Sequence, residues 1–564
     1  MRFLFALVAN LVLLLVWPLR ALRRRRAAPR GAWLEVELEG GLVEVARSVP
    51  FWQRHRQPVA LESLRRLARV AGADPRVSGV LFRVQGLSIG SARATSLREV
   101  IGLFRRSGKE VAVYLPHGGG TQSVFVASAA DRILLGPETQ LELTGYAVDA
   151  TYLREALDRL GVEPEVFAKG RYKTAGEFLE KKSMGEAQRE QLGALLDTLH
   201  AGLLDALASG RRMDPSVARA LVDEGPWSAR QALARGLVDA IVYPDELPKA
   251  LVRDGTSPAP LIPAGRYLRR RCPRFVALRR RSYVAVVDVV GPIVSEVPMS
   301  LVPVAAEKAV CRAVDLARED PCARGAVIHV SSRGGSALAS DRMLRAVKNL
   351  AAVKPVSVYL GDVAASGGYM IAVGASPIVA QPSTVTGSIG VIAARFGVAP
   401  LLARLGLAVE VVKRGASADF SNPARRLSAN EVARLESQIE ETYRSFLEAV
   451  AHGRGMSVEA VQPLAAGRVW SGADAKRHGL LDELGGFDVA LASVRSRLGA
   501  GAEALEPCVV GPEPLRPMGP LGRLLGVGAL HTGLGPTLEL VQVALGDARA
   551  RAWLFSEVSA PHDG

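Results

Sequence analysis

Two long stretches of this chain resemble each other when the sequence is shifted by 245 residues. They stay in register without a gap from Tyr114 to Gly170. A second match, at an offset of 243, pairs Trp227-Ser228 with Trp470-Ser471 and Gly236-Leu237 with Gly479-Leu480. Chance similarity does not readily supply so many glycines and prolines at one offset, so the chain is expected to use one folding unit twice. The identical pairs include Tyr114/Tyr359, Leu115/Leu360, Ala127/Ala372, Ile133/Ile378, Pro137/Pro382, Thr139/Thr384, Gly145/Gly390, Gly161/Gly406, Glu165/Glu410 and Gly170/Gly415.

Within each copy, short β-branched runs alternate with helical stretches. The runs VAVYL (111–115) and VSVYL (356–360) predict buried strands. Each is followed by a glycine-containing turn and an apolar helix that begins near residue 121 or 366. This alternation predicts an α/β fold with a largely parallel sheet in each copy. A chain of 564 residues also exceeds the size at which one core keeps growing.

The amino-terminal residues 3–19, FLFALVANLVLLLVWPL, are almost unbroken apolar. At about 1.5 Å per residue, a helix of this length lies near the short limit for crossing a bilayer. We expect a single transmembrane segment or uncleaved signal anchor. A cleaved signal peptide is less favoured, because only Arg2 and the amine precede the apolar run and the arginines follow it. The arginines that follow the run favour a cytoplasmic main body under the positive-inside rule.

The net charge of +15 is concentrated in two arginine clusters. Without them the remainder is close to neutral, so the folded domains need not be basic. Anionic lipid is therefore a better partner for these clusters than nucleic acid, and a solvated linker is the alternative for the central one. The clusters are Arg20, Arg23, Arg24, Arg25, Arg26 and Arg30, and Arg266, Arg269, Arg270, Arg271, Arg274, Arg279, Arg280 and Arg281.

Composition also predicts the boundaries of the units, because proline, glycine and arginine gather between and after the two copies. The expected segments are an anchor with its basic flank at 1–26, a first domain at 32–242, a linker at 243–281, a second domain at 282–497 and a tail at 498–564.

Chemistry is expected where the copies differ, because a duplicated scaffold keeps its packing residues in both. The second copy opens a helix with Ser366 in GDVAASGGYM, where the first copy has Thr121 in PHGGGTQSVF. The second copy carries the glycine pair of SSRGGS, where the first reads GLSIGS. The first copy carries Lys173 in RYKTAGE, where the second has Ala418.

Each difference has a chemical use. A serine at a helix start, flanked by glycines, exposes its hydroxyl with little crowding, and the helix dipole favours developing negative charge. Gly334 and Gly335 can approach a carbonyl closely and lend N–H donors to an oxyanion hole, at about 3 to 4 kcal/mol per donor. A serine nucleophile still needs a base.

The base is better sought in a lysine than in a histidine. His117 lies in the first-copy turn and His329 in a strand pattern, and neither has a sequence context typical of a catalytic base. Lys173 can serve if burial lowers its pKa from about 10.4 to near 8. The alternative is a surface lysine in a basic helix, because Lys169, Lys181 and Lys182 are neighbours.

The motifs GRYKTAGE, SSRGGS, DVAASGGYM and QPSTVTGSIG, in this order within a tandem repeat, resemble the long form of the bacterial signal peptide peptidase A family (protease IV), across roughly residues 35–495. The resemblance implies a Clp-protease or crotonase-like fold in each half and a Ser-Lys dyad shared between the halves. Carried over by position, it implies Ser366 as nucleophile, Lys173 as base, Ser388 as the hydroxyl that orients the lysine amine, and Gly335 and Gly367 as oxyanion donors beside Gly334.

The resemblance also implies hydrolysis of cleaved signal peptides, a bacterial inner-membrane location and bowl-shaped homo-oligomers, tetrameric in this family. No metal or cofactor is expected. Arg333 departs from the family pattern, which has proline before the glycine pair, and this difference is expected to affect the oxyanion strand and specificity. The family faces the periplasm whereas the arginine flank favours the cytoplasm, so the side of the membrane is left open.

Two other classes of function are compatible with parts of the sequence. A crotonase-like acyl-CoA enzyme would share the implied fold, but it predicts acidic catalytic residues and a CoA site and leaves the combination of Lys173 and Ser366 unexplained. A non-catalytic membrane scaffold would keep the fold alone, and retention of serine, lysine and the glycine pair together argues against it.

Overall fold

The computed structural model describes residues 27–48, 57–252, 257–272, 280–296 and 303–511, with six further residues between positions 10 and 17. Most of the predicted membrane segment and most of the predicted tail lie outside these residues. Across the part that is described, no helix is long and apolar enough to cross a bilayer.

The first half is built on a six-stranded sheet in which every neighbouring pair is parallel. Its strand order is β11-β7-β5-β4-β1-β12. The strands are β1 (Ala32–Gly40), β4 (Val77–Leu87), β5 (Glu110–Leu115), β7 (Arg132–Leu135), β11 (Ala240–Ile241) and β12 (Leu261–Pro263). Helices cover both faces, because apolar side chains of the strands are buried on each. One face carries α3 (Leu61–Gly72), α4 (Ser91–Arg106), α5 (Thr121–Ala127), α8 (Glu186–Arg211), α9 (Pro215–Asp223), α10 (Ala229–Ala234) and α12 (Ala264–Arg271), and the other α11 (Leu247–Ala250).

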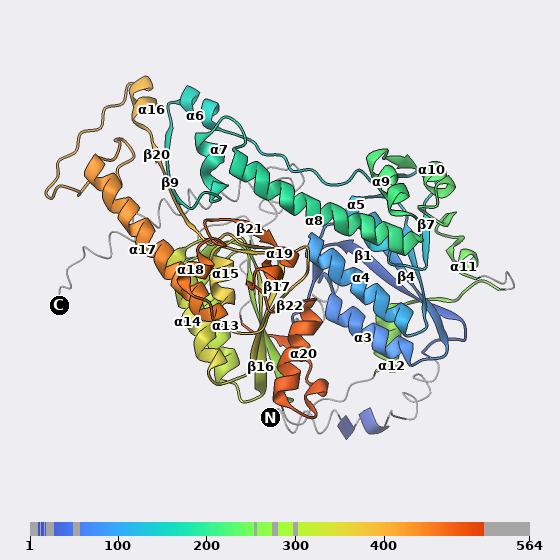
Figure 1. Ribbon diagram of the computed structural model, residues 1–564. Coiled ribbons are helices and arrows are strands. Elements are labelled where there is room, and N and C mark those ends of the chain that lie inside the picture. The colour runs from blue at the N-terminus through green and yellow to red at the C-terminus, as the bar shows by residue number, and fades with distance from the viewer. Residues whose placement is uncertain are drawn as a thin grey trace.

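The second half repeats this order as β22-β18-β17-β16-β13-β23, again parallel. These strands are β13 (Tyr283–Val290), β16 (Ala323–Ser332), β17 (Val356–Ala365), β18 (Ile378–Ala380), β22 (Glu483–Leu484) and β23 (Pro507–Val509). The far end of β17 also pairs with β19 (Val385–Gly387), which is antiparallel to β21 (Val469–Ser471). The covering helices are α13 (Glu307–Glu319), α14 (Ala337–Ala351), α15 (Gly367–Ala372), α17 (Ala429–Arg454), α18 (Val458–Val461), α19 (Gly472–Arg477) and α20 (Phe487–Leu498). The predicted α/β fold is confirmed in both copies (Figure 1).

The Trp-Ser pair matched at the offset of 243 makes the same two kinds of hydrogen bond in each half. The indole Nε1 of Trp227 donates to Leu221 O at 2.8 Å, and that of Trp470 donates to Leu464 O at 2.9 Å. The serine that follows each tryptophan caps the next helix, α10 or α19, by accepting a backbone N–H bond. These residues match because both copies need the same anchor and cap.

The segment 243–281, expected to be a linker, instead contributes structure to the first half. It contains α11, β12 and α12, and β12 pairs in parallel with β1. Tyr267 on α12 is fully buried, and its hydroxyl donates to Asp74 Oδ2 at 3.0 Å. The start of the expected tail also belongs to the fold, because its strand β23 pairs in parallel with β13 of the second half. A run of three residues carries too little periodicity to predict a strand. Such short strands form because they pair with the edge of an existing sheet.

The two halves also pair through a two-stranded antiparallel ribbon. Strand β9 (Glu163–Lys169) from the first half is antiparallel to β20 (Val391–Gly397) from the second. Together with α6 (Arg154–Leu160), α7 (Glu177–Glu180) and α16 (Ala399–Arg404), this ribbon forms an arm, residues 154–180 and 391–404, that projects from the sheets (Figure 1). The shorter elements are β2 (Leu42–Val43), β3 (Val59–Ala60), β6 (Gly119–Gly120), β8 (Gln140–Glu142), β10 (Trp227–Ser228), β14 (Ile293–Val294), β15 (Ala305–Ala306) and the 3-10 turns η2 (Thr174–Gly176) and η3 (Ala502–Ala504).

An ion pair made by a buried arginine joins the two halves. The Arg65 side chain on α3 is 6% exposed, and its NH2 lies 2.8 Å from Asp488 Oδ1 on α20. Its NH1 lies 3.9 Å from Glu44 Oε2. Burial raises the pKa of Glu44, which is enclosed between the halves with its Oε2 otherwise without a hydrogen-bond partner among the described residues. The contact is therefore sensitive to loss of the guanidinium.

Candidate active site

Ser366 sits on a strained turn between strand and helix. Strand β17 ends at Ala365 and α15 begins at Gly367. The φ angle of Ser366 is 54°, a region that residues other than glycine rarely adopt. Its N–H donates to Gly387 O at 2.8 Å, which holds the turn in place. The turn presents the hydroxyl at the helix start, where the dipole favours negative charge.

Lys173 approaches this hydroxyl from the first half of the same chain. The residue lies in the turn that follows β9 and precedes η2, and it is 7% exposed. Its Nζ is 3.2 Å from Ser366 Oγ, 3.0 Å from Ser388 Oγ and 2.9 Å from Ser388 O. Burial lowers the pKa of Lys173 to about 7. The amine is therefore largely uncharged at mildly alkaline pH, and the surface-lysine alternative is wrong.

Ser388 follows β19 and, like Ser366, has a positive φ, in this case 52°. Its N–H donates to Arg468 O at 2.7 Å. Because Ser388 gives Lys173 both a backbone carbonyl and a hydroxyl, it fixes the amine from two directions. The preceding residue, Gly387, accepts from Ser366 N–H, so one short stretch of backbone positions the whole cluster.

The glycine pair of the second half lies against Ser366. A Cβ at Gly334 would lie 2.8 Å from both Ser366 Cβ and Gly367 N, so only glycine allows this approach. The N–H of Gly334 already donates to Ser332 Oγ at 3.1 Å. Gly335 has a φ of 153°, and a Cβ there would lie 2.1 Å from Ile293 O. Among the described residues, the backbone hydrogen bonds leave the N–H groups of Gly335 and Gly367 without an acceptor.

The corresponding position in the first half is occupied differently. Thr121 Oγ1 bonds to Glu142 O at 3.3 Å and to Gly145 O at 3.1 Å, and is therefore used for packing. Ala418, the counterpart of Lys173, is exposed. The structure thus assembles one serine-lysine pair from the two copies.

His329, one of the two histidines named above, lies on β16 of the second sheet. His329 is buried, its Nδ1 is 3.0 Å from Asp288 Oδ1, and its ring stacks on Tyr359 with centroids 5.7 Å apart. It is not among the hydrogen-bond partners of Ser366 or Lys173. His329 is a packed core residue.

Sequence reasoning missed the residues that hold the lysine turn. Gln191 on α8 bonds to both neighbours of Lys173, and the backbone of 466–469 lies beneath them. The repeat marks Trp470-Ser471, which directly follow this backbone segment, but it does not indicate the contact with the lysine turn. No local pattern marks Gln191, because its partners are distant in sequence.

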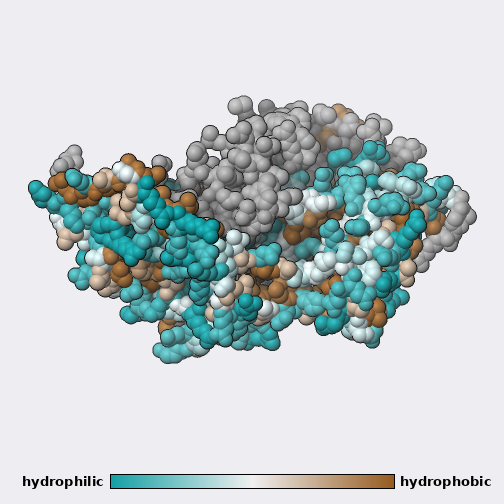
Figure 2. All heavy atoms as spheres, turned by 90° about the horizontal axis from the view of Figure 1, so that it is seen from above, coloured by the Kyte–Doolittle hydropathy of each residue, from teal (hydrophilic) through white to brown (hydrophobic). Residues whose placement is uncertain are grey.

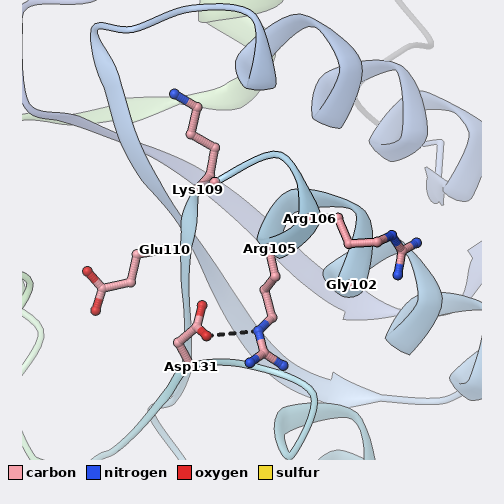
Figure 3. Close-up of a pocket in the computed structure, with 7 residues that line it drawn as sticks. Gly102, Arg105, Arg106, Lys109, Glu110 and Asp131 are labelled. Atoms are coloured by element: carbon pink, nitrogen blue, oxygen red, sulfur yellow. Dashed lines mark hydrogen bonds and ion pairs between the residues drawn. The ribbon is translucent and has the colours of Figure 1, made fainter.

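A separate open hollow of about 570 Å³ lies at the end of α4 (Figure 3). It is lined by Gly102, Arg105, Arg106, Gly108, Lys109, Glu110 and Asp131. Arg105 Nε bonds to Asp131 Oδ1 at 2.8 Å across its wall. None of the predicted site residues lines it.

Comparison with known proteins agrees with the duplication. The sequence pattern of peptidase family S49 matches residues 103–254 and 348–500, more than half of the chain. The serine protease SPPA of Arabidopsis thaliana chloroplasts is 31% identical over 520 residues, 90% of this chain and 75% of that protein. Protease 4 of Salmonella typhi is 32% identical over 452 residues, 75% of this chain and 70% of that protein.

A solved structure, a point mutant of ClpP1 from Listeria monocytogenes, is 16% identical and covers 36% of this chain and 93% of its own, with a TM-score of 0.24. That likeness is too weak to carry an argument, whereas the sequence matches extend across both halves. The predicted family is therefore confirmed: the chain belongs to peptidase family S49 and is a serine peptidase.

Proposed function

We propose that this peptidase is a membrane-bound endopeptidase in which Ser366 is the nucleophile and Lys173 the general base. The observation that carries the proposal is the distance of 3.2 Å between Lys173 Nζ and Ser366 Oγ, with the amine buried. An ordinary serine is a weak nucleophile, and an uncharged amine at hydrogen-bond distance supplies the missing base.

The contacts of Lys173 suit an uncharged amine. A neutral amine has two N–H donors and one lone pair. The two donors can bond to Ser388 O and Ser388 Oγ, at 2.9 and 3.0 Å. The lone pair is then left for the hydroxyl proton of Ser366. Ser388 would thus orient the base.

Catalysis would proceed by acyl transfer. Lys173 accepts the hydroxyl proton as Ser366 Oγ attacks the substrate carbonyl, and the N–H groups of Gly335 and Gly367 stabilise the oxyanion. The lysine then gives its proton to the leaving amine. In the second half-reaction Lys173 takes a proton from water as the water oxygen attacks the acyl-enzyme, and it gives that proton to Ser366 Oγ as the ester bond breaks, which restores the neutral amine.

The alternatives have less support. Among the described residues, no carboxylate bonds to Ser366 or Lys173, so the acidic catalysis expected of an acyl-CoA enzyme has no counterpart. A non-catalytic scaffold would have no reason to keep Lys173 buried beside Ser366, because burying an amine opposes folding.

The substrate proposed is a hydrophobic peptide, in particular a cleaved signal peptide. The support is the apolar run at residues 3–19, which would hold the enzyme at the bacterial inner membrane where such peptides are released. Protease digestion of intact and permeabilised cells tests on which side of the inner membrane the peptidase domains lie. Periplasmic domains are cut while the inner membrane is intact, and cytoplasmic domains are cut only after the inner membrane has been permeabilised.

A homo-oligomer is also proposed, tetrameric as the family resemblance implies. Its support is the apolar surface toward the end of the arm (Figure 2). Leu405, Leu407 and Val412 just beyond α16 are 64%, 56% and 92% exposed, more than an isolated surface residue needs. Sedimentation of the detergent-solubilised protein should give a multiple of the 59.9 kDa chain, and a monomer under all conditions would contradict this assembly.

Labelling with a serine-directed fluorophosphonate and hydrolysis of a fluorogenic hydrophobic peptide test the dyad. Ser366→Ala should abolish both. Lys173→Ala should lower hydrolysis by about 10³-fold or more, whereas Lys181→Ala, an exposed lysine paired with Glu177 at 2.7 Å, should not. His329→Ala should retain catalysis if the variant folds. Substantial hydrolysis by a folded Lys173→Ala enzyme would refute the dyad.

A further inference from the structure

The lysine turn of the first half lies on a backbone segment of the second half. Tyr172 N–H donates to Ala466 O at 2.8 Å. A Cβ at Gly467 would lie 2.4 Å from Lys173 N, so the two backbones are in direct contact. On its other side the same segment bonds to the cluster, because Arg468 O accepts the N–H of Ser388. The segment 466–469 therefore joins the backbone of the lysine turn to the backbone of Ser388, the serine that contacts the lysine amine directly.

A buried side chain, that of Gln191, ties the lysine turn to this segment. Gln191 on α8 is 5% exposed. Its Nε2 donates to Thr174 Oγ1 at 2.7 Å and to Tyr172 O at 3.3 Å. Its Oε1 accepts the N–H of Val469 at 3.2 Å. The amide thus uses both of its N–H donors and its carbonyl acceptor.

We propose that Gln191 is a positioning residue for catalysis, which fixes the Lys173 turn against the strand beside Ser388. Its bonds reach the residues on both sides of Lys173, so the lysine is held from before and after. The third bond reaches Val469 on β21, which lies opposite Gly387 in β19. This inference rests on the proposed dyad, since it concerns the placement of its base.

The consequence for catalysis follows from distance. Lys173 must stay within hydrogen-bond reach of Ser366, and a displacement of about 1 Å in such a constellation can cost about 10²-fold in rate. A second contact, between Tyr172 OH and Glu190 at 2.9 Å, lies at the exposed side of the turn and does not span Lys173. Glu190 in turn pairs with Arg468 at 2.9 Å. Gln191 is the buried link.

A role limited to packing makes a different prediction. If Gln191 only satisfies buried polar groups, its replacement lowers stability and leaves the enzyme that remains folded with normal kinetics. If it positions Lys173, its replacement lowers kcat with little effect on KM. The loosened turn also lets water reach the Lys173 amine, which burial holds at a pKa of about 7. Its pKa then rises, and the acid limb of the pH-rate profile moves to higher pH.

The test uses Gln191→Met in the full-length, detergent-solubilised enzyme, because methionine keeps the volume and removes the amide. Gln188→Met is the matched control: Gln188 lies on the same helix, and its Oε1 accepts from Tyr152 OH at 2.8 Å, away from the turn. We expect Gln191→Met to lower kcat at pH 7.5 by tenfold or more, with KM within twofold, and to raise the acid-limb midpoint. Gln188→Met should change each by less than twofold.

Thr174→Val provides a second variant if Gln191→Met does not fold, because it removes the other end of the shortest bond. Its kcat and pH profile should change in the same direction, and the double variant should be no worse than Gln191→Met alone. Normal kcat and an unchanged acid limb in folded Gln191→Met or Thr174→Val would overturn the inference. Hydrolysis retained by Lys173→Ala would instead overturn the dyad, so the two failures are distinguishable.

Discussion

Replacing Lys173 by methionine should make the protein more stable at neutral pH while abolishing catalysis. Methionine fills a similar volume and carries no charge. In the native enzyme, burial lowers the pKa of Lys173 from 10.5 to about 7. At about 1.4 kcal/mol per pKa unit, the protonated amine costs the folded state about 5 kcal/mol relative to the unfolded chain.

The sign follows from proton binding. Above about pH 10.5 the amine is neutral in both states, so Lys173 imposes no charge penalty. As the pH falls, the unfolded chain binds the proton first and the folded state loses about 1.4 kcal/mol per pH unit until about pH 7. Wild-type stability therefore gains from this group as the pH rises from 7 toward 10.5.

The net gain at pH 7 is smaller than the full penalty, because the variant loses the bonds to Ser366 and Ser388. At about 1 kcal/mol per hydrogen bond, the three lost bonds leave a net stabilisation of about 2 kcal/mol. The more decisive quantity is the slope. The stability advantage of the variant should fall by about 1 kcal/mol between pH 7 and 8, where the folded-state amine is still partly protonated, and by about 1.3 kcal/mol between pH 8 and 9.

Urea unfolding followed by tryptophan fluorescence at pH 7, 8 and 9 measures this slope. Lys181→Met is the control, because its side chain is 48% exposed and its replacement should show no comparable dependence. Parallel stability curves for Lys173→Met and wild type across this range would show that burial does not set the charge of Lys173.

Two further substitutions test other contacts. Gly335→Ala places a Cβ 2.1 Å from Ile293 O and should lower peptide hydrolysis by about 10²-fold, whereas Gly406→Ala, also at positive φ but with nothing within 4 Å, should leave hydrolysis unchanged. Normal hydrolysis by Gly335→Ala would remove that glycine from the oxyanion site. Arg65→Met should lower the free energy of unfolding by about 3 kcal/mol, because it leaves the buried Glu44 carboxylate without its cation and removes the ion pair with Asp488 across the halves. On the same helix, Arg69→Met should cost under about 0.5 kcal/mol, since Arg69 is 65% exposed; equal effects in urea unfolding would contradict this account.

The duplication made much of the fold predictable. Strand runs such as VAVYL and VSVYL are fully buried in parallel sheets, and such strands are marked by their own β-branched composition. The edge strands β12 and β23 escaped prediction because three residues carry no periodicity. They form only where a neighbouring strand offers free backbone groups.

Some of the candidate residues followed from comparing the copies, whereas Ser388 and Gly367 followed from the family resemblance. Ser366, Lys173 and the glycine pair stood out because each differs from its counterpart, and shared packing cannot explain a difference. Gln191 could not be found this way, since its significance depends on two segments it touches only in the folded chain. Its type and spacing resemble those of any polar residue on an amphipathic helix.

The sequence by itself determined that one α/β unit occurs twice and that the two copies carry unlike polar groups, because strand composition and repeat offset are local properties of the chain. Only the tertiary structure decided that Lys173 lies 3.2 Å from Ser366, across 193 residues, and that it is buried there. Both results depend on how the halves dock through the β9-β20 ribbon. Distance and burial together set the charge of the amine, and neither is a property of the lysine alone.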